Sequence, residues 1–142
     1  MLETEVAKFQ NILNANPKII TAYLLGSTAT GLATPTSDID IAVYGTNFDY
    51  EDYKSLKQDL EQATTKSVDL SVITFDTDAF FVQQIIKHGV PIVIHDEHKK
   101  ALMESKFLLK YYDQKYYLDK QNEYVKRKLN SLWWTRNFYA EK

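Results

Sequence analysis

The sequence predicts an α/β fold in which a small mixed β-sheet is flanked by helices and followed by a long C-terminal helix or helix pair. Helix-like spacing of apolar residues alternates with short β-branched runs over residues 1–94. From residue 97 onward there is neither glycine nor proline, and good helix formers dominate. The 142 residues suffice for one buried core, so we expect a single domain, with a core at 18–95 and a helical segment at 97–142.

The individual elements follow from local patterns. Residues 2–14 carry apolar side chains at helical steps, whereas residues 19–25 form an apolar run that ends at a glycine, as a buried strand does. Pro91 favours an edge strand. In chain order we expect a helix over 2–14, a strand over 19–25, a loop over 26–37, a strand over 38–44, a helix over 50–64, a strand over 68–73, a helix over 77–87 and a short strand over 90–94.

The C-terminal segment carries a stripe of apolar side chains. Leu102, Leu109, Tyr112 and Tyr116 recur at steps of seven, three and four, and we expect them to pack against the domain's own sheet. The ten tyrosines and two tryptophans of the chain exceed the needs of a small core. A surface for a partner is therefore the alternative, because tyrosine and tryptophan favour interfaces.

Charge is divided unevenly along the chain. Residues 1–98 hold 14 acidic and 6 basic side chains, whereas residues 99–142 hold 5 acidic and 11 basic ones. This asymmetry fits either an electrostatically steered partner or the solvated face of a long helix. No aromatic motif of an RNA-binding module accompanies the basic run at 126–128, so we do not expect direct binding of nucleic acid.

Composition excludes several classes of protein. The chain has no cysteine, which rules out disulfides, thiolate metal sites and cysteine nucleophiles. The N-terminus lacks the basic start of a signal peptide, and no run of about 18 apolar residues suits a membrane span. We therefore expect a soluble, cytoplasmic protein.

Polar residues at predicted strand ends form the most informative pattern. One strand ends in Gly26 and Ser27, and after ten further residues come Asp38 and Asp40. Side chains alternate along a strand, so Asp38 and Asp40 share one face. The same alternation places Asp69 on the polar side of a later strand, where it joins the pair if the two strands are neighbours.

Three carboxylates on one face of a sheet repel one another and predict a cation site. Hard oxygen ligands select magnesium or manganese. Two such ions activate an attacking hydroxyl and stabilise the leaving oxygens during in-line displacement at a phosphate. Asp38, Asp40 and Asp69 are therefore the predicted metal ligands and catalytic residues of a nucleotide transfer.

The loop between these strands has features of a phosphate site. Gly26 lets the backbone approach a ligand, and the Ser27 hydroxyl with the following N–H groups would hold a triphosphate. Ser37 is either a further phosphate contact or a simple turn residue. The histidines show no recognisable ligand spacing with the aspartates, so we expect no catalytic or metal role for His88, His95 or His98.

The pattern resembles the signature of the nucleotidyltransferase superfamily related to DNA polymerase beta, which is Gly-Ser, a loop, Asp-X-Asp and a later Asp. The similarity covers residues 19–73. The length is that of a minimal nucleotidyltransferase, and in particular the chain resembles the MntA antitoxins, which are paired with HEPN-domain ribonuclease toxins. The matching positions are Gly26, Ser27, Asp38, Asp40 and Asp69.

The resemblance implies a nucleotidyltransferase fold and a specific reaction. Such an antitoxin transfers AMP from ATP to a tyrosine hydroxyl near the active site of its cognate HEPN toxin. Gly26 and Ser27 would then hold the triphosphate, and Asp38 and Asp40 would bind both magnesium ions. Asp69 would complete the shell of one ion and help to deprotonate the acceptor tyrosine.

One position departs from the family pattern. Many relatives carry an arginine before the second glycine of the loop, whereas this chain has Thr30 before Gly31. Two alternative functions remain: transfer to a small molecule such as an aminoglycoside, whose enzymes usually add a helical domain, and an antitoxin that acts by binding without turnover. The sequence leaves open the nucleobase, the acceptor, the number of AMP units transferred and the oligomeric state.

Overall fold

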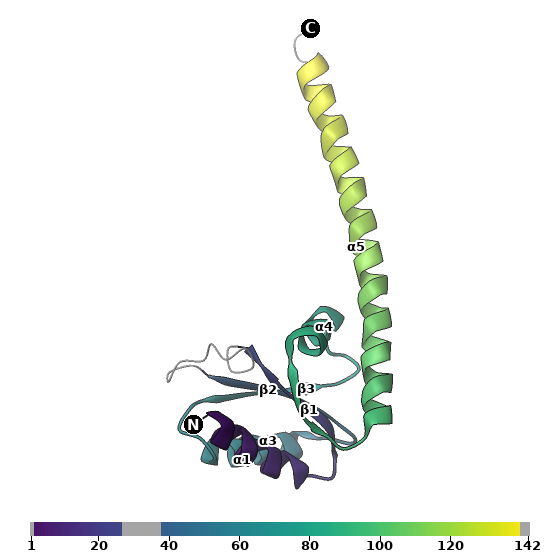
Figure 1. The fold of residues 1–142 in the computed structure, drawn as a ribbon. Helices are drawn as coiled ribbons and strands as arrows, with labels where there is room; N and C mark the ends of the chain where they lie inside the picture. Colours follow the sequence, from purple (N-terminus) through teal and green to yellow (C-terminus); the bar gives the residue numbers. More distant parts are fainter. Residues whose placement is uncertain (1, 27–37, 140–142) are drawn as a thin grey trace.

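The computed structural model describes residues 2–26 and 38–139 (Figure 1). These residues form four helices and a four-stranded sheet, so the predicted α/β class and the small mixed sheet are confirmed. In chain order the elements are α1 (Leu2–Asn14), β1 (Ile19–Leu25), β2 (Ile39–Gly45), α3 (Tyr50–Gln62), β3 (Val68–Ile73), α4 (Ala79–His88), β4 (Val90–Ile94) and α5 (Glu97–Tyr139).

The sheet has the strand order β3-β2-β1-β4. β1 runs antiparallel to β2 and β4, whereas β2 and β3 run parallel and are connected through α3. β4 lies at an edge, as Pro91 predicts, because proline has no backbone N–H to donate to a second neighbour. The β2–β3 pair is therefore the only parallel pair in the described sheet.

Helices cover both faces of the sheet, because the strands are apolar on both sides. α1 and α3 lie on one face, and α4 and α5 lie on the other (Figure 1). Phe9 of α1 and Leu60 of α3 pack with Ile41 of β2 in the first core. Phe107 of α5 packs with Tyr23 of β1 in the second core, which also includes the buried side chains of α4.

The last element, α5, is one helix rather than a helix pair. Its first part packs on α4 and on β1 through Met103 and Phe107. Every side chain from residue 112 to residue 136 is exposed, and this part of the helix extends away from the sheet (Figure 1). Within the described ranges, no helix is long and apolar enough to cross a membrane.

The predicted packing of one apolar stripe on the sheet is wrong. Its four residues are between 48% and 67% exposed, whereas Met103 and Phe107 are each 1% exposed and make the contact instead. The physical reason is that α5 carries apolar side chains on several faces, so helical spacing alone does not decide which face meets the sheet. The misplaced residues are Leu102, Leu109, Tyr112 and Tyr116.

A buried tyrosine connects α5 to the sheet. The Tyr23 hydroxyl donates a hydrogen bond to Glu104 Oε1 at 2.6 Å, and Lys100 Nζ lies 2.7 Å from the same oxygen. Burial of the phenol, assisted by Glu104, raises the pKa of Tyr23 far above its usual range, so the hydroxyl keeps its proton. The first turns of α5 are thereby fixed relative to β1.

Several boundaries differ from those predicted. β2 spans Ile39–Gly45 rather than 38–44, so Asp38 lies just outside the strand, and α4 ends at His88 rather than at residue 87. α4 begins at Ala79 rather than at residue 77, because Asp78 caps the helix and a turn precedes it. In that turn the Thr74 N–H donates to Thr77 Oγ1 at 2.8 Å. α3 ends at Gln62 rather than at residue 64.

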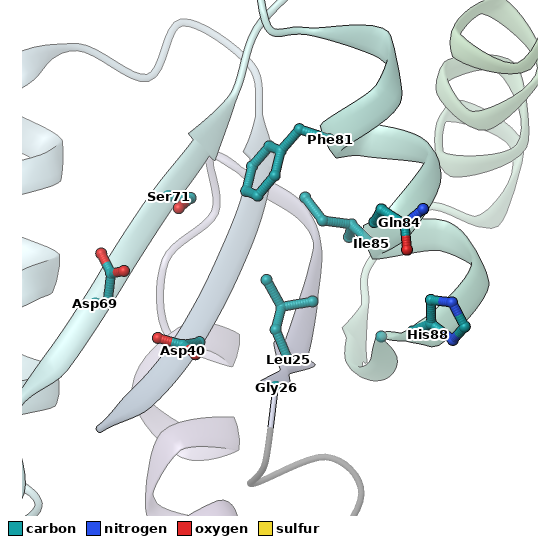
Figure 2. A pocket seen from close by; sticks show the side chains of 10 residues that line it. Leu25, Gly26, Asp40, Asp69, Ser71, Phe81, Gln84, Ile85 and His88 are labelled. Atoms are coloured by element: carbon teal, nitrogen blue, oxygen red, sulfur yellow. The ribbon is translucent and has the colours of Figure 1, made fainter. Parts of the chain in front are cut away.

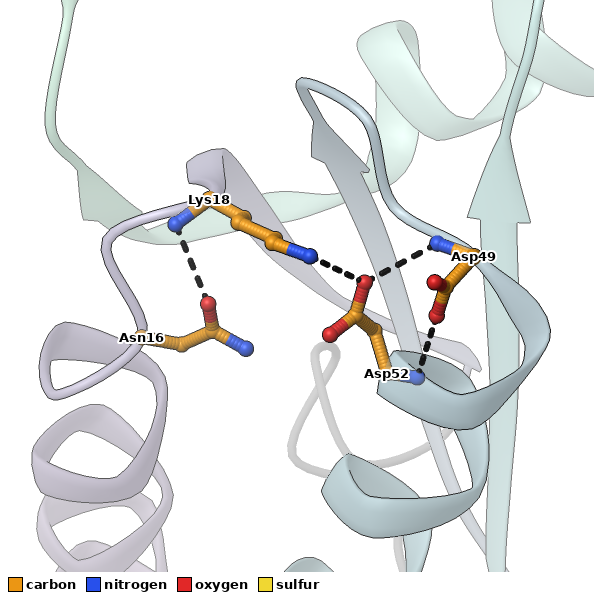
Figure 3. A network of polar contacts seen from close by, with 4 residues as sticks. All are labelled: Asn16, Lys18, Asp49 and Asp52. Atoms are coloured by element: carbon orange, nitrogen blue, oxygen red, sulfur yellow. Dashed lines mark hydrogen bonds and ion pairs between the residues drawn. The ribbon is translucent and has the colours of Figure 1, made fainter.

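A capping box fixes the start of α3 (Figure 3). The Asp52 N–H donates to Asp49 Oδ1 at 2.8 Å, and the Asp49 N–H donates to Asp52 Oδ2 at 3.0 Å. The same Asp52 oxygen lies 2.8 Å from Lys18 Nζ, and the Lys18 N–H donates to the side chain of Asn16. These contacts connect the start of α3 to the segment that leads into β1.

Replacing the cap is expected to destabilise the fold. Asp49→Ala leaves an N–H group of the first turn without its acceptor and should lower the free energy of unfolding by about 1 kcal/mol. Urea denaturation measures the change. Asp59→Ala, at an exposed position inside the same helix, is the control and should shift stability by less than about 0.5 kcal/mol. Equal losses in the two variants would contradict a capping role.

Candidate active site

The parallel pairing of β2 and β3 places Asp40 directly beside Asp69. The next pair in the register, Ile41 and Leu70, points into the core beneath α1 and α3. Because strand side chains alternate, the two aspartates lie on the opposite face, on the side of α4. Both carboxylates border the same open space there (Figure 2). The predicted condition that the two strands are neighbours is met.

Asp40 lies close to the charges of two other carboxylates, Asp69 and Asp38. Partial burial raises the pKa of this carboxyl group above its usual range, and the nearby charges of Asp69 and Asp38 raise it further. The ionised form is therefore disfavoured in the folded protein unless a cation or another donor neutralises it.

Asp38 lies just before β2 and is exposed. Its charge acts on Asp40, yet in the part of the chain that the structure describes no group of three or more His, Cys, Asp or Glu side chains is arranged to hold a metal ion. The structure thus brings together two of the three predicted ligands, Asp40 and Asp69. Magnesium commonly uses one or two carboxylates, with waters and substrate phosphates filling its other positions, so this pair suits it chemically.

Gly26 directly follows β1 and lies against the Asp40 carboxylate. Its φ of +66° lies in the left-handed region, and a Cβ added there would come 2.7 Å from Asp40 Oδ2. The preceding residue, Leu25, pairs with Asp40 in the register of β1 and β2. Glycine is therefore required by both the backbone conformation and the close approach of Asp40.

The other predicted phosphate contacts, Ser27 and Ser37, lie outside the described residues, as do Thr30 and Gly31.

A pocket of about 300 Å³ opens beside the two aspartates (Figure 2). The sheet and the end of β1 form one side, and α4 forms the other. The α4 residues recur at steps of three, one and three, so they belong to one face of the helix. The lining consists of Leu25, Gly26, Asp40, Asp69, Ser71, Phe81, Gln84, Ile85, His88 and Gly89.

Sequence reasoning missed the α4 wall of this pocket. His88 lines it, although its distance in sequence from the aspartates gave no reason to connect them. The available signal was the helical spacing of Phe81, Gln84, Ile85 and His88, in which polar side chains flank a buried Ile85. What remained unknown was that this face of α4 lies above the ends of the strands.

His95 lies elsewhere and makes structural contacts. Its Nδ1 donates to the carbonyl oxygen of Ile19 at 2.6 Å, and its Nε2 lies 3.0 Å from the side-chain oxygen of Asn14. The residue therefore links the end of β4 to β1 and α1.

The fold and the paired carboxylates define a class of enzyme, and comparison with known proteins agrees. Residues 7–98 match the model of the family described as polymerase beta, nucleotidyltransferase. The chain belongs to this family. Its structural neighbours are MntA-type antitoxins of HEPN and minimal-nucleotidyltransferase pairs, so the predicted resemblance to a minimal nucleotidyltransferase is confirmed. No curated protein sequence matches the chain.

Three solved structures show the extent of the similarity. A toxin–antitoxin complex with AMP-PNP contains a chain with 26% identity and a TM-score of 0.71, covering 84% of this chain and 97% of that one. A chain of a mutant MntA-HpeT complex has 27% identity and a TM-score of 0.67, and the match covers 84% of this chain and 95% of that one. The complex of a tri-AMPylated Shewanella oneidensis HEPN toxin with an MNT antitoxin contains a chain with 24% identity and a TM-score of 0.68, and the match covers 88% of this chain and 98% of that one. This is a likeness of fold alone.

The raised pKa of Asp40 leads to a prediction about stability. Ionisation of a group whose folded pKa is raised destabilises the fold at neutral pH, so Asp40→Asn should raise the melting temperature in the absence of divalent cations. Magnesium should stabilise the wild-type protein, because it binds the folded carboxylate pair, and should stabilise the variant much less.

Thermal unfolding with EDTA and with added magnesium measures both effects. Asp59→Asn removes an exposed carboxylate outside the pocket and is the matched control. A magnesium shift of wild-type size in Asp40→Asn would contradict the assignment of Asp40 as a ligand.

Proposed function

We propose that the protein is a magnesium-dependent nucleotidyltransferase that transfers AMP from ATP to a tyrosine hydroxyl of a cognate HEPN-domain ribonuclease toxin, and so acts as an antitoxin. The observation that carries the proposal is the pairing of Asp40 with Asp69 beside an open pocket. Similar chains occur in toxin–antitoxin complexes, one of which contains AMP-PNP and another a tri-AMPylated HEPN toxin, and this supports the choice of donor and acceptor.

The aspartates would hold the metal and accept a proton. Asp40 and Asp69, joined by Asp38, supply carboxylate oxygens for magnesium, which when bound stabilises negative charge at the reacting phosphate. The acceptor oxygen forms a bond to the α-phosphorus of ATP, the bond to the oxygen that bridges to the β-phosphate breaks, and pyrophosphate leaves. Asp69, the more exposed of the paired carboxylates, takes the hydroxyl proton.

The pocket offers suitable surroundings for the reactants. Phe81 and Ile85 present apolar surface that suits a planar ring, either the nucleobase or the acceptor phenol. Gln84 and His88 place hydrogen-bonding groups on the same wall. Ser27 and Ser37 would contact the triphosphate.

Transfer of label from ATP tests the proposal. The purified protein is incubated with magnesium, ATP labelled at the α-phosphate and the product of the adjacent gene, which should become labelled. Asp40→Asn and Asp69→Asn should each reduce the rate by about 100-fold or more, because each removes charge that acts in the transition state. Asp59→Asn should leave the rate unchanged. Absence of label with the wild-type protein, or equal label with the site variants, would refute the proposal.

Gly26 provides a second test of the same site. In Gly26→Ala and Gly26→Asn a Cβ displaces the Asp40 carboxylate, so both variants should lose about 10-fold or more in transfer rate. Asparagine tolerates positive φ better than alanine, so Gly26→Asn should lose less folding stability. Rates and urea denaturation separate these effects. A wild-type rate in both variants would show that the close approach is not needed.

The exposed part of α5 favours a second candidate function, an antitoxin that acts by binding without turnover. Combined replacement of Asp38, Asp40 and Asp69 by asparagine distinguishes the two functions in cells that express the toxin. Retained neutralisation by this variant would support binding alone. Loss of neutralisation, with complex formation intact, would support catalysis.

A further inference from the structure

The part of α5 that extends beyond the sheet carries aliphatic side chains along one side. Leu118, Val125, Leu129 and Leu132 are 45%, 50%, 61% and 56% exposed, and we call them the outer apolar face. A helix in water normally turns such residues toward a core. Exposed apolar side chains that recur along one side of a helix mark an interaction site on a soluble protein.

The outer apolar face continues the side of α5 that is already buried. Phe107 packs in the second core, and Tyr111 packs against that core and against Phe80. From Phe107 the steps to Tyr111, Leu118, Val125, Leu129 and Leu132 are four, seven, seven, four and three, which keeps all six on one side of the helix. The side that meets α4 in the first turns thus faces outward, uncovered by the described residues, in the later turns.

Basic side chains surround this face. Residues 124–136 contain four basic residues and no acidic one, and these are Lys126, Arg127, Lys128 and Arg136. Residues 1–98 of the same chain carry a net charge of −8, so the basic side chains are concentrated in α5. Lys126 and Lys128 lie on the two borders of the face, Arg136 lies on the face near its C-terminal end, and Arg127 lies on the opposite side of the helix. The face is therefore flanked by positive charge in the turns around Val125 and Leu129.

We propose that the outer apolar face is the docking surface for the protein that receives the nucleotide, and that this partner presents an apolar groove bordered by carboxylates. The identity of the partner as acceptor rests on the proposed function. The docking itself rests on the continuous face and its charge. An amphipathic helix laid into a complementary groove is a common mode of protein recognition.

Charge argues against a second copy as the occupant. A parallel pair of α5 helices would bring the two basic segments together. An antiparallel pair would place each basic segment against residues 110–120, which contain three lysines and two aspartates. Neither arrangement supplies the missing negative charge, whereas an acidic partner does.

Aliphatic side chains argue against RNA as the occupant. Single-stranded nucleic acid is held by stacking on aromatic rings and by phosphate contacts. Leu118, Val125, Leu129 and Leu132 offer neither, so they would stay exposed to water in such a complex. Burial against apolar protein surface removes them from water, which is favourable.

Docking on this face would also place the partner correctly for transfer. Its spacing from Phe107 and Tyr111, which pack against α4, places the outer apolar face on the side of α5 where α4 lies. α4 also forms a wall of the candidate pocket (Figure 2). The Tyr23–Glu104 hydrogen bond and the burial of Phe107 fix the start of α5 relative to the sheet. A partner held by the later turns would therefore extend over α4 toward Asp40 and Asp69.

Two variants of the full-length protein test the proposal. Val125→Gln/Leu129→Gln removes apolar surface from the outer apolar face and retains good helix formers. Leu109→Gln/Tyr116→Gln removes similar surface from another side of α5, at residues that are 67% and 59% exposed, and is the matched control. Circular dichroism checks that both keep the helix. Calorimetry with the adjacent gene's product measures binding, and α-labelled ATP measures transfer.

We expect the Val125/Leu129 variant to bind about 10-fold or more weakly, because truncation of buried interface residues has effects of this size. Its KM for the protein acceptor should rise, while kcat at saturating acceptor stays near the wild-type value. The control should bind as the wild-type protein does. Lys126→Glu/Lys128→Glu should also weaken binding, because the proposed groove carries carboxylates along its borders.

Other results would overturn the proposal. Wild-type affinity in the Val125/Leu129 variant would do so, as would a wild-type protein that does not bind the adjacent gene's product. A Val125/Leu129 variant that binds the acceptor as before but no longer self-associates in sedimentation would show that the face holds a second copy. A variant that binds the acceptor as before but loses binding to a single-stranded RNA oligonucleotide would show that the face holds RNA. Binding through this face without labelling of the partner would refute the proposed function and leave the docking surface supported.

Discussion

The parallel register of β2 and β3 is the constraint on which the rest of the molecule depends. It places Asp40 beside Asp69, and it requires a crossover, which α3 provides on the face away from these carboxylates. The apolar residues that alternate with the aspartates form the first core, so folding of the sheet brings like charges together. The free energy gained by burying Ile41 and Leu70 offsets the repulsion between Asp40 and Asp69.

This arrangement explains why the site needs little specialised structure around it. Gly26 permits β1 to approach Asp40, and α4 closes the other side of the pocket, where Ile85 also belongs to the second core. Leu25 and Ile85 therefore contribute both to the lining of the candidate site and to the packing of the second core. A small domain can hold such a site because the same strand alternation provides both a core and a polar face.

Sequence patterns predicted the sheet and the side of it on which Asp40 and Asp69 lie, because both depend on alternation within short segments. Asp40 and Asp69 could be assigned to a face from their apolar neighbours alone. The α4 wall could not be predicted, since it depends on how one helix packs above strand ends far away in sequence. The choice of face on α5 failed for a related reason: Leu102 and Met103 are adjacent and both apolar, and only the position of α4 decides which is buried.

The end of internal packing at Tyr111 has a consequence for the motions of α5. Helices in proteins owe most of their stability to packing, so the free energy needed to open the backbone should fall from the turns around Phe107 toward the C-terminus. Local i,i+4 contacts such as Arg127 with Glu123 compensate only slightly. Protection of the backbone N–H groups against hydrogen exchange would thus decrease along α5, sharply where the sheet ends and slowly beyond it.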